Sequence, residues 1–135
     1  MSDTVILTET PQERALRTGE ATPHFLQGVF PFAGRGLFDL APLDDTLAYT
    51  VPDGKKTQFV YFRAGNASEA LIYLAFAVDD TPMRYFPVGP NADIHVSLAI
   101  VEPHLPGVRL SLLIAAPRGT NGTVIVDAGF VESAQ

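Results

Sequence analysis

The chain has 135 residues, of which 47% are hydrophobic and 18% charged, and its formal net charge is −6. The acidic balance argues against a nucleic-acid binder. The absence of cysteine excludes disulfides, thiolate metal ligands and thiol nucleophiles. No apolar run reaches the ~18 residues that span a bilayer, so no membrane partner is expected. We expect one soluble domain. Residues 1–5 carry no basic or long apolar signal region, which favours a cytoplasmic location.

Residues 1–45 differ from the rest of the chain and are expected to form an N-terminal strand and arm. Residues 4–8 predict a short strand, and residues 11–17 predict one helical turn with Thr10 as its N-cap. Residues 21–43 are rich in glycine and proline but contain four phenylalanines, among them Phe30 and Phe32, which require burial. We therefore expect an irregular arm or extended strand that packs on the sheets or on a neighbouring chain.

Residues 46–135 alternate short apolar runs with turn residues, as is typical of all-β domains, and form the expected core of the single domain. The run 71–78 is apolar at every position, which predicts a central strand covered on both faces. The segments 94–100 and 108–114 predict a hairpin with Ile100 opposite Leu110. Together the runs predict an antiparallel β-sandwich or jelly roll of seven or eight strands, and a closed barrel would share this local pattern.

No catalytic or metal-binding pattern is visible in the sequence. The three histidines are far apart and lack the spacing of a metal site, and no serine lies in a nucleophile-elbow motif. The paired carboxylates at 44–45 and 79–80 fall in turns, where such residues usually bond to the backbone. We predict no metal, no cofactor and no enzymatic activity.

A second pattern suits a small-ligand or glycan site, because sugar sites often place an aromatic ring beside charged groups. Tyr61 and Arg63 share one strand face, and Arg84 and His95 complete the candidate ligand-binding set. The same tyrosines also fit the half-buried edge of a core.

Hydrophobic residues also occupy positions that should face away from the core, including Leu113 and Ile125. Since a monomeric sandwich normally keeps one wet face on each sheet, we expect a second face to be covered. The arm, through Phe30 and Phe32, or a partner subunit would cover it. The leading hypothesis is a non-enzymatic homo-oligomer that self-assembles through apolar sheet faces. The alternatives are a carbohydrate- or small-ligand-binding module and an accessory subunit with a heteromeric protein partner in a larger enzyme complex.

Overall fold

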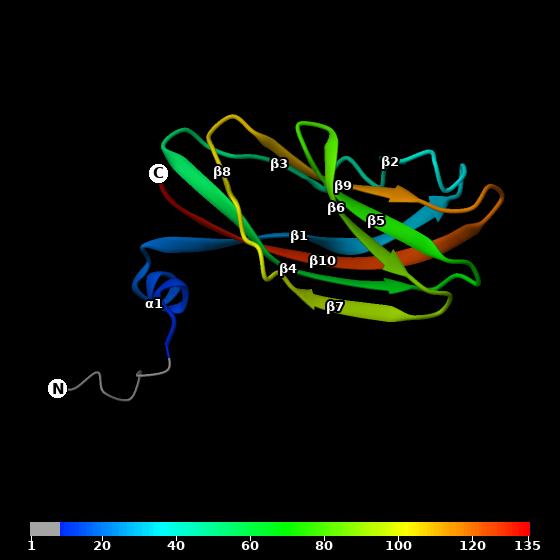
Figure 1. Cartoon of the computed structure of the whole chain (residues 1–135), viewed down its shortest axis with the longest axis horizontal. Coiled ribbons are helices and arrows are strands. Elements are labelled where there is room, and N and C mark those ends of the chain that lie inside the picture. The colour runs from blue at the N-terminus through cyan, green and yellow to red at the C-terminus, as the bar shows by residue number, and fades with distance from the viewer. Residues whose placement is uncertain (1–8) are drawn as a thin grey trace.

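The computed structural model describes residues 9–135, which form two antiparallel sheets packed face to face (Figure 1). Sheet A has the order β1 (Ala21–Ala33), β10 (Asn121–Ala134), β4 (Lys55–Asn66) and β7 (Asp93–Ser97), and β8 (Pro103–His104) also pairs with β4. Sheet B has the order β2 (Ala41–Pro42), β9 (Arg109–Ala115), β5 (Ile72–Val78) and β6 (Thr81–Val88), and β3 (Ala48–Thr50) pairs with β9. The predicted antiparallel sandwich is confirmed, with two separate sheets rather than one closed barrel.

The core lies between the inward faces of the two sheets. In β10, Val124, Val126, Ala128 and Phe130 alternate with outward residues and are at most 2% exposed, as their spacing predicts. Aromatic rings join the sheets, because Phe62 of β4 stacks on Phe86 of β6 with ring centroids 4.2 Å apart. Phe59 similarly contacts Phe76 of β5 at 4.5 Å. These contacts fix how sheet A is oriented on sheet B.

Helix α1 (Pro11–Thr18) precedes β1 and has the predicted cap. The Thr10 hydroxyl accepts a bond from the Glu13 N–H at 3.1 Å, and the Glu13 carboxylate accepts one from the Thr10 N–H at 3.3 Å. Gly19 ends the helix with a φ of 82°. The helix buries none of its residues, so its capping hydrogen bonds stabilise it more than packing does. The strand expected at residues 4–8 lies outside the described residues.

The predicted hairpin between residues 94–100 and 108–114 is wrong, because the two segments belong to different sheets. Strand β7 pairs with β4, with Arg63 opposite His95, whereas β9 pairs with β5, with Phe76 opposite Leu112. The predicted inward faces are correct for residues 94–98 and 108–114, whose alternate apolar residues enter the same core, but wrong for Ile100, which is 69% exposed. Alternation identifies the buried face of a strand, but it does not identify the strand beside it.

The phenylalanine-rich segment is more regular than expected over residues 21–33, but the expected burial of its four phenylalanines is wrong for Phe25 and Phe38, which are exposed. Residues 21–33 form β1, which pairs with β10 along its whole length, from Ala21 opposite Ser133 to Ala33 opposite Asn121. Residues 1–45 and 46–135 therefore contribute strands to the same two sheets. No helix in the described part of the chain has the length and apolarity of a membrane-spanning segment.

The segment between β1 and β3 covers part of the outward face of sheet B. Ala75, Ala77 and Leu113 face away from the core but are buried, and Leu40 from this segment packs against them. The Tyr73 hydroxyl donates a hydrogen bond to the Leu37 carbonyl at 2.5 Å, which ties the same segment down. This stretch of the chain therefore buries outward apolar residues without a second subunit.

Candidate functional site

The outward side chains of sheet A lie in rows that cross its strands. The register places Gln27, Asp127, Arg63 and His95 side by side on β1, β10, β4 and β7. The rows on either side consist of Phe25, Gly129, Tyr61 and Ser97 and of Val29, Ile125, Gly65 and Asp93. Side chains across a strand pair and two apart along a strand are neighbours, so these rows form one continuous surface.

Asp127 is the centre of a polar cluster on this surface. Its carboxylate accepts a hydrogen bond from the Tyr61 hydroxyl at 3.0 Å and forms an ion pair with Arg63 at 2.5 Å. The Arg63 guanidinium also lies 5.5 Å from the centre of the Tyr61 ring. Burial, reinforced by the nearby Asp127 carboxylate, raises the pKa of Tyr61. The hydrogen bond to Asp127 raises the pKa of Arg63.

The position of Tyr61 depends on a glycine in the neighbouring strand. The Tyr61 ring lies over Gly129, where a Cβ atom would come within 1.9 Å of Tyr61 Cε2. The pairing of β10 with β4 changes register between Gly129 and Phe130. On its other side the ring meets His95 edge-on, with the ring centroids 6.3 Å apart. Tyr61 therefore lies between β10 and β7 and reaches Asp127.

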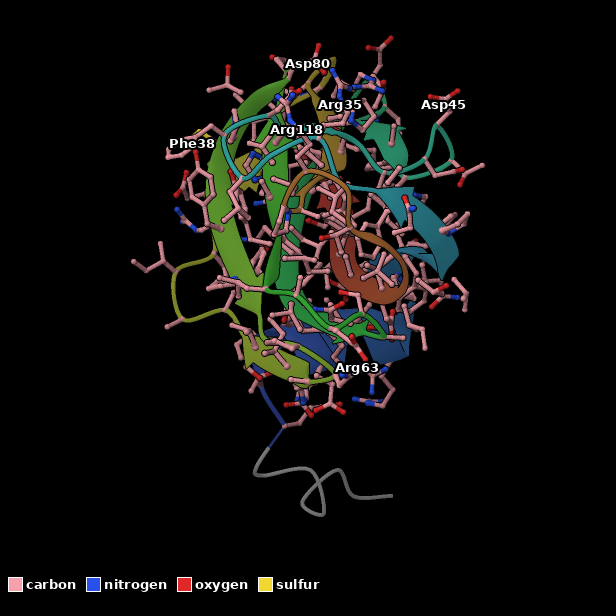
Figure 2. All side chains as sticks on the ribbon, turned by 90° about the vertical axis from the view of Figure 1, so that its right-hand side faces the viewer. Arg35, Phe38, Asp45, Arg63, Asp80 and Arg118 are labelled. Carbon is pink, nitrogen blue, oxygen red and sulfur yellow. The ribbon has the colours of Figure 1, made fainter. Side chains whose placement is uncertain are left out.

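A second glycine opens a hollow in the adjacent row. A Cβ atom at Gly65 would find its nearest neighbour, Asp93 Cβ, 4.0 Å away, so the space above Gly65 is open. The hollow has a volume of about 540 Å³, and its side-chain walls come from Arg63, Asp93, His95, Ile125 and Asp127. Arg63 projects from the side of the molecule opposite Asp80 (Figure 2).

Three of the four predicted ligand-binding residues come together here. Tyr61, Arg63 and His95 meet on one face because β7 pairs with β4. Arg84 does not join them, since it lies on β6 of sheet B and forms an ion pair with Glu102 at 2.7 Å. Asp127 was missed by the sequence reasoning. Its alternation with inward residues of β10 was the available signal, but no local motif pointed to Arg63 as its partner.

The four predicted interface residues fall into different environments. Phe32 and Leu113 are buried within the single chain, and Phe30 packs against the core. Ile125 is 53% exposed and forms the apolar wall of the hollow. Beside it, Val29 is 64% exposed, so the hollow has an apolar margin on the side of β1.

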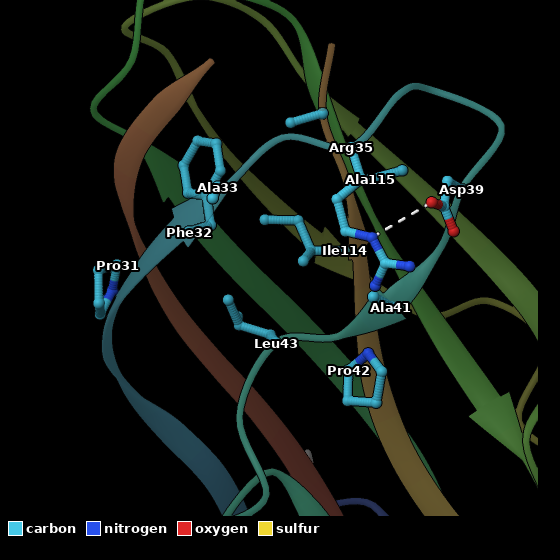
Figure 3. Close-up of a pocket in the computed structure, with 11 residues that line it drawn as sticks. Pro31, Phe32, Ala33, Arg35, Asp39, Ala41, Pro42, Leu43, Ile114 and Ala115 are labelled. Atoms are coloured by element: carbon cyan, nitrogen blue, oxygen red, sulfur yellow. Dashed lines mark ion pairs between the residues drawn. The ribbon is translucent and has the colours of Figure 1, made fainter. Parts of the chain in front are cut away.

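A smaller hollow of about 210 Å³ opens between the edges of the two sheets (Figure 3). Phe32, Leu43 and Ile114 contribute to its apolar lining. Arg35 is beside it, and its guanidinium forms an ion pair with Asp39 at 3.2 Å. The outer face of sheet A offers more polar groups and more space, and we treat it as the candidate site.

Three of the four turn carboxylates bond within the chain. Asp44 accepts a hydrogen bond from the Thr46 N–H at 3.0 Å, and Asp79 accepts one from the Arg109 N–H at 2.9 Å. Asp80 forms an ion pair with the Arg109 side chain at 2.9 Å. Within residues 9–135, no three His, Cys, Asp or Glu side chains are grouped closely enough to hold a metal ion.

The chain was compared with protein-family models, curated proteins and solved structures. No family model matches the sequence, and no curated protein matches it. Among solved structures, the chain is similar to one described as the structure of infectious bursal disease virus, Gt strain. The TM-score is 0.48 and the sequence identity 11%, over 84% of this chain and 33% of the viral chain. The chain thus spans about a third of the length of that viral chain.

Proposed function

We propose that the chain is a binding module for a neutral, hydroxyl-rich small molecule, with carbohydrates as the ligand class. The hollow above Gly65 on the outer face of sheet A is the proposed site. The observation that carries the proposal is the convergence of Arg63, His95, Asp93 and Asp127 around an open floor. A volume of about 540 Å³ is within the range of small-molecule sites, which is roughly 300–1,000 Å³.

The polar groups of the hollow match a ligand that both donates and accepts hydrogen bonds. The carboxylates of Asp93 and Asp127 accept bonds from hydroxyl groups, and the Arg63 guanidinium donates them. Ile125 offers an apolar wall for the C–H face of a sugar ring. Tyr61 holds Asp127 in place through its hydroxyl, and so acts as a positioning residue rather than as part of the wall.

Charge favours a neutral ligand over an anionic one. Two carboxylates face one guanidinium in the hollow, and the whole chain carries a formal charge of −6. A phosphate or an acidic sugar would meet repulsion from both sources. A neutral saccharide meets neither and still uses every polar group of the site.

Titration of ¹⁵N-labelled protein with neutral and acidic saccharides, followed by NMR, tests the proposal. We expect saturable shifts at the amides of Gly65, Asp93 and Ile125 with neutral sugars only. Gly65→Val fills the hollow and should weaken binding at least tenfold, while the strand accepts a β-branched residue. Ser97→Val, on the same face but outside the hollow, should bind normally. The proposal is wrong if no neutral sugar binds at millimolar concentration, or if Gly65→Val binds as the wild type does.

Self-association is a second candidate function. It is supported by Phe25, Val29 and Ile125, which are 47%, 64% and 53% exposed and lie together on the β1 side of sheet A.

A further inference from the structure

Strand β1 is the outermost strand of sheet A, so one of its edges has no neighbouring strand among the described residues. The bonds around β10 show which backbone groups point to that edge. The Ala67 N–H donates to the Thr123 carbonyl at 2.9 Å. The backbone N–H and C=O groups of Thr123 and of alternate residues up to Gly129 are therefore directed toward β4. The backbone groups of the residues between them are directed toward β1. A bond of 2.6 Å from the Gly34 N–H to the Thr120 carbonyl fits the same alternation.

The free edge of β1 follows from this alternation. Leu26, Gly28 and Phe30 lie opposite the β10 residues that point toward β1, so their backbone groups bond inward. Phe25, Gln27 and Val29 therefore direct their N–H and C=O groups away from the sheet. Unpaired groups of this kind are a template for another strand.

Two prolines flank this open stretch symmetrically. Pro23 and Pro31 have the same parity as Gln27 and lie at equal distances before and after it in the sequence. They therefore stand at the free edge, where their missing N–H removes no bond to β10. Gln27 is also the midpoint of β1, whose bounds are Ala21 and Ala33. The donors of the free edge are thus arranged symmetrically about Gln27.

We infer that this edge pairs with the same edge of a second copy of the chain, antiparallel about a twofold axis at Gln27. In this register Gln27 lies opposite Gln27 of the second copy, and Phe25 lies opposite Val29. Every N–H at the open stretch finds a carbonyl. Each proline lies opposite a proline of the second copy, so the positions without donors face one another. The two A sheets become one continuous sheet, and an isologous contact of this kind closes at a dimer.

The side chains at this edge suit the same partner. Phe25 and Val29 face outward and are largely exposed, and the twofold register brings an aromatic ring beside a β-branched side chain in each cross-strand pair. Ile125 lies next to Val29, so the apolar margin of one copy continues into Phe25 of the other. An unrelated strand would have to match both the symmetric donors and this apolar pair, whereas a second copy matches them by symmetry.

Sedimentation velocity from low micromolar to several hundred micromolar tests the inference. We expect a species of twice the chain mass of 14.5 kDa that grows with concentration. Gln27→Pro removes the central free N–H without removing a bond to β10, and should give a folded monomer. Gln27→Ala keeps the N–H and should dimerise. A wild type that stays monomeric, or a dimeric Gln27→Pro, overturns the inference.

Two further variants keep the test decisive if Gln27→Pro does not fold. The combined Phe25→Lys and Val29→Lys substitutions place lysines opposite each other across the axis at exposed positions, and should give a monomer.

Because the chain has no cysteine, Gln27→Cys introduces a single thiol, and the expected Cα separation of about 5.5 Å suits a disulfide. Oxidation should then yield a covalent dimer, whereas Ser97→Cys on β7 should not. A lysine variant that remains dimeric, or equal cross-linking at both positions, contradicts the inference. Gly65→Val should dimerise normally, which separates this inference from the proposed ligand site.

Discussion

Replacing Gly129 with alanine tests whether this glycine is required by the Tyr61 ring. The new Cβ atom would lie 1.9 Å from Tyr61 Cε2, so the ring must move off β10 and lose its hydrogen bond to Asp127. Overpacking of this kind costs about 1–3 kcal/mol. Because Gly129 does not have a positive φ, alanine recovers about 0.4–1 kcal/mol by restricting the unfolded chain. We expect the free energy of unfolding to fall by about 1–2 kcal/mol.

Urea unfolding followed by circular dichroism and tyrosine fluorescence measures this change, since the chain has no tryptophan. The decisive comparison uses Tyr61→Ala as the background. Without the ring, Gly129→Ala should stabilise the protein by about 0.4–1 kcal/mol, so the sign of its effect reverses. An equal loss of stability in both backgrounds would refute the reasoning, because the backbone at the register change would then require glycine by itself.

Three other predictions concern buried or half-buried polar groups. Asn66 donates hydrogen bonds to three carbonyls and is 2% exposed, so Asn66→Ala should cost about 3 kcal/mol in urea unfolding, whereas exposed Asn121→Ala should cost little. Burial and the hydrogen bond to Glu132 raise the pKa of Tyr49 to about 12, so the fold favours the neutral phenol. That stability is present below pH 10 and lost as the pH rises toward 12, and Tyr49→Phe should reduce the alkaline pH dependence of the urea midpoint by the share that Tyr49 contributes. Ser111 Oγ is buried without a partner among the described residues, so Ser111→Ala should raise the thermal midpoint through a gain of about 1 kcal/mol.

The faces of the strands could be predicted from the sequence, because side-chain direction alternates along any strand whatever its neighbour is. The inward set of β10 follows from this alternation, and the two-sided burial of Leu74 and Ala75 in β5 follows from the unbroken apolar run around them. The pairing of the strands could not be predicted in this way. Val96 and Leu112 enter the same core from opposite sheets, and an apolar residue across the core looks the same in sequence as one across a hairpin.

The candidate site was predictable to the extent that it lies along one strand. Tyr61 and Arg63 are two residues apart on β4, so their shared face needs no tertiary information. His95 and Asp127 reach them only through the register of β4 with β7 and β10, which depends on packing across the whole sheet. Arg84 lies in sheet B, so only the three-dimensional structure could exclude it from the candidate site.

The outward apolar residues show a similar limit. Leu113 is apolar and faces away from the core, which implies that something covers it. The cover is Leu40, which lies in an irregular segment without a periodic pattern. Periodicity therefore indicates that a face is buried, but it carries no information about which segment buries it.

The position of β10 in sheet A constrains the order of events during synthesis. It lies between β1 and β4, although it follows both in the sequence, and its pairs with β1 join residues as distant as Ala21 and Ser133. Until β10 has left the ribosome, no strand joins β1 to β4. Sheet A is therefore incomplete, and it cannot cover the inward face of sheet B. The fold must therefore close late, after translation of β10, and such long-range pairing is typical of domains that fold in milliseconds to seconds.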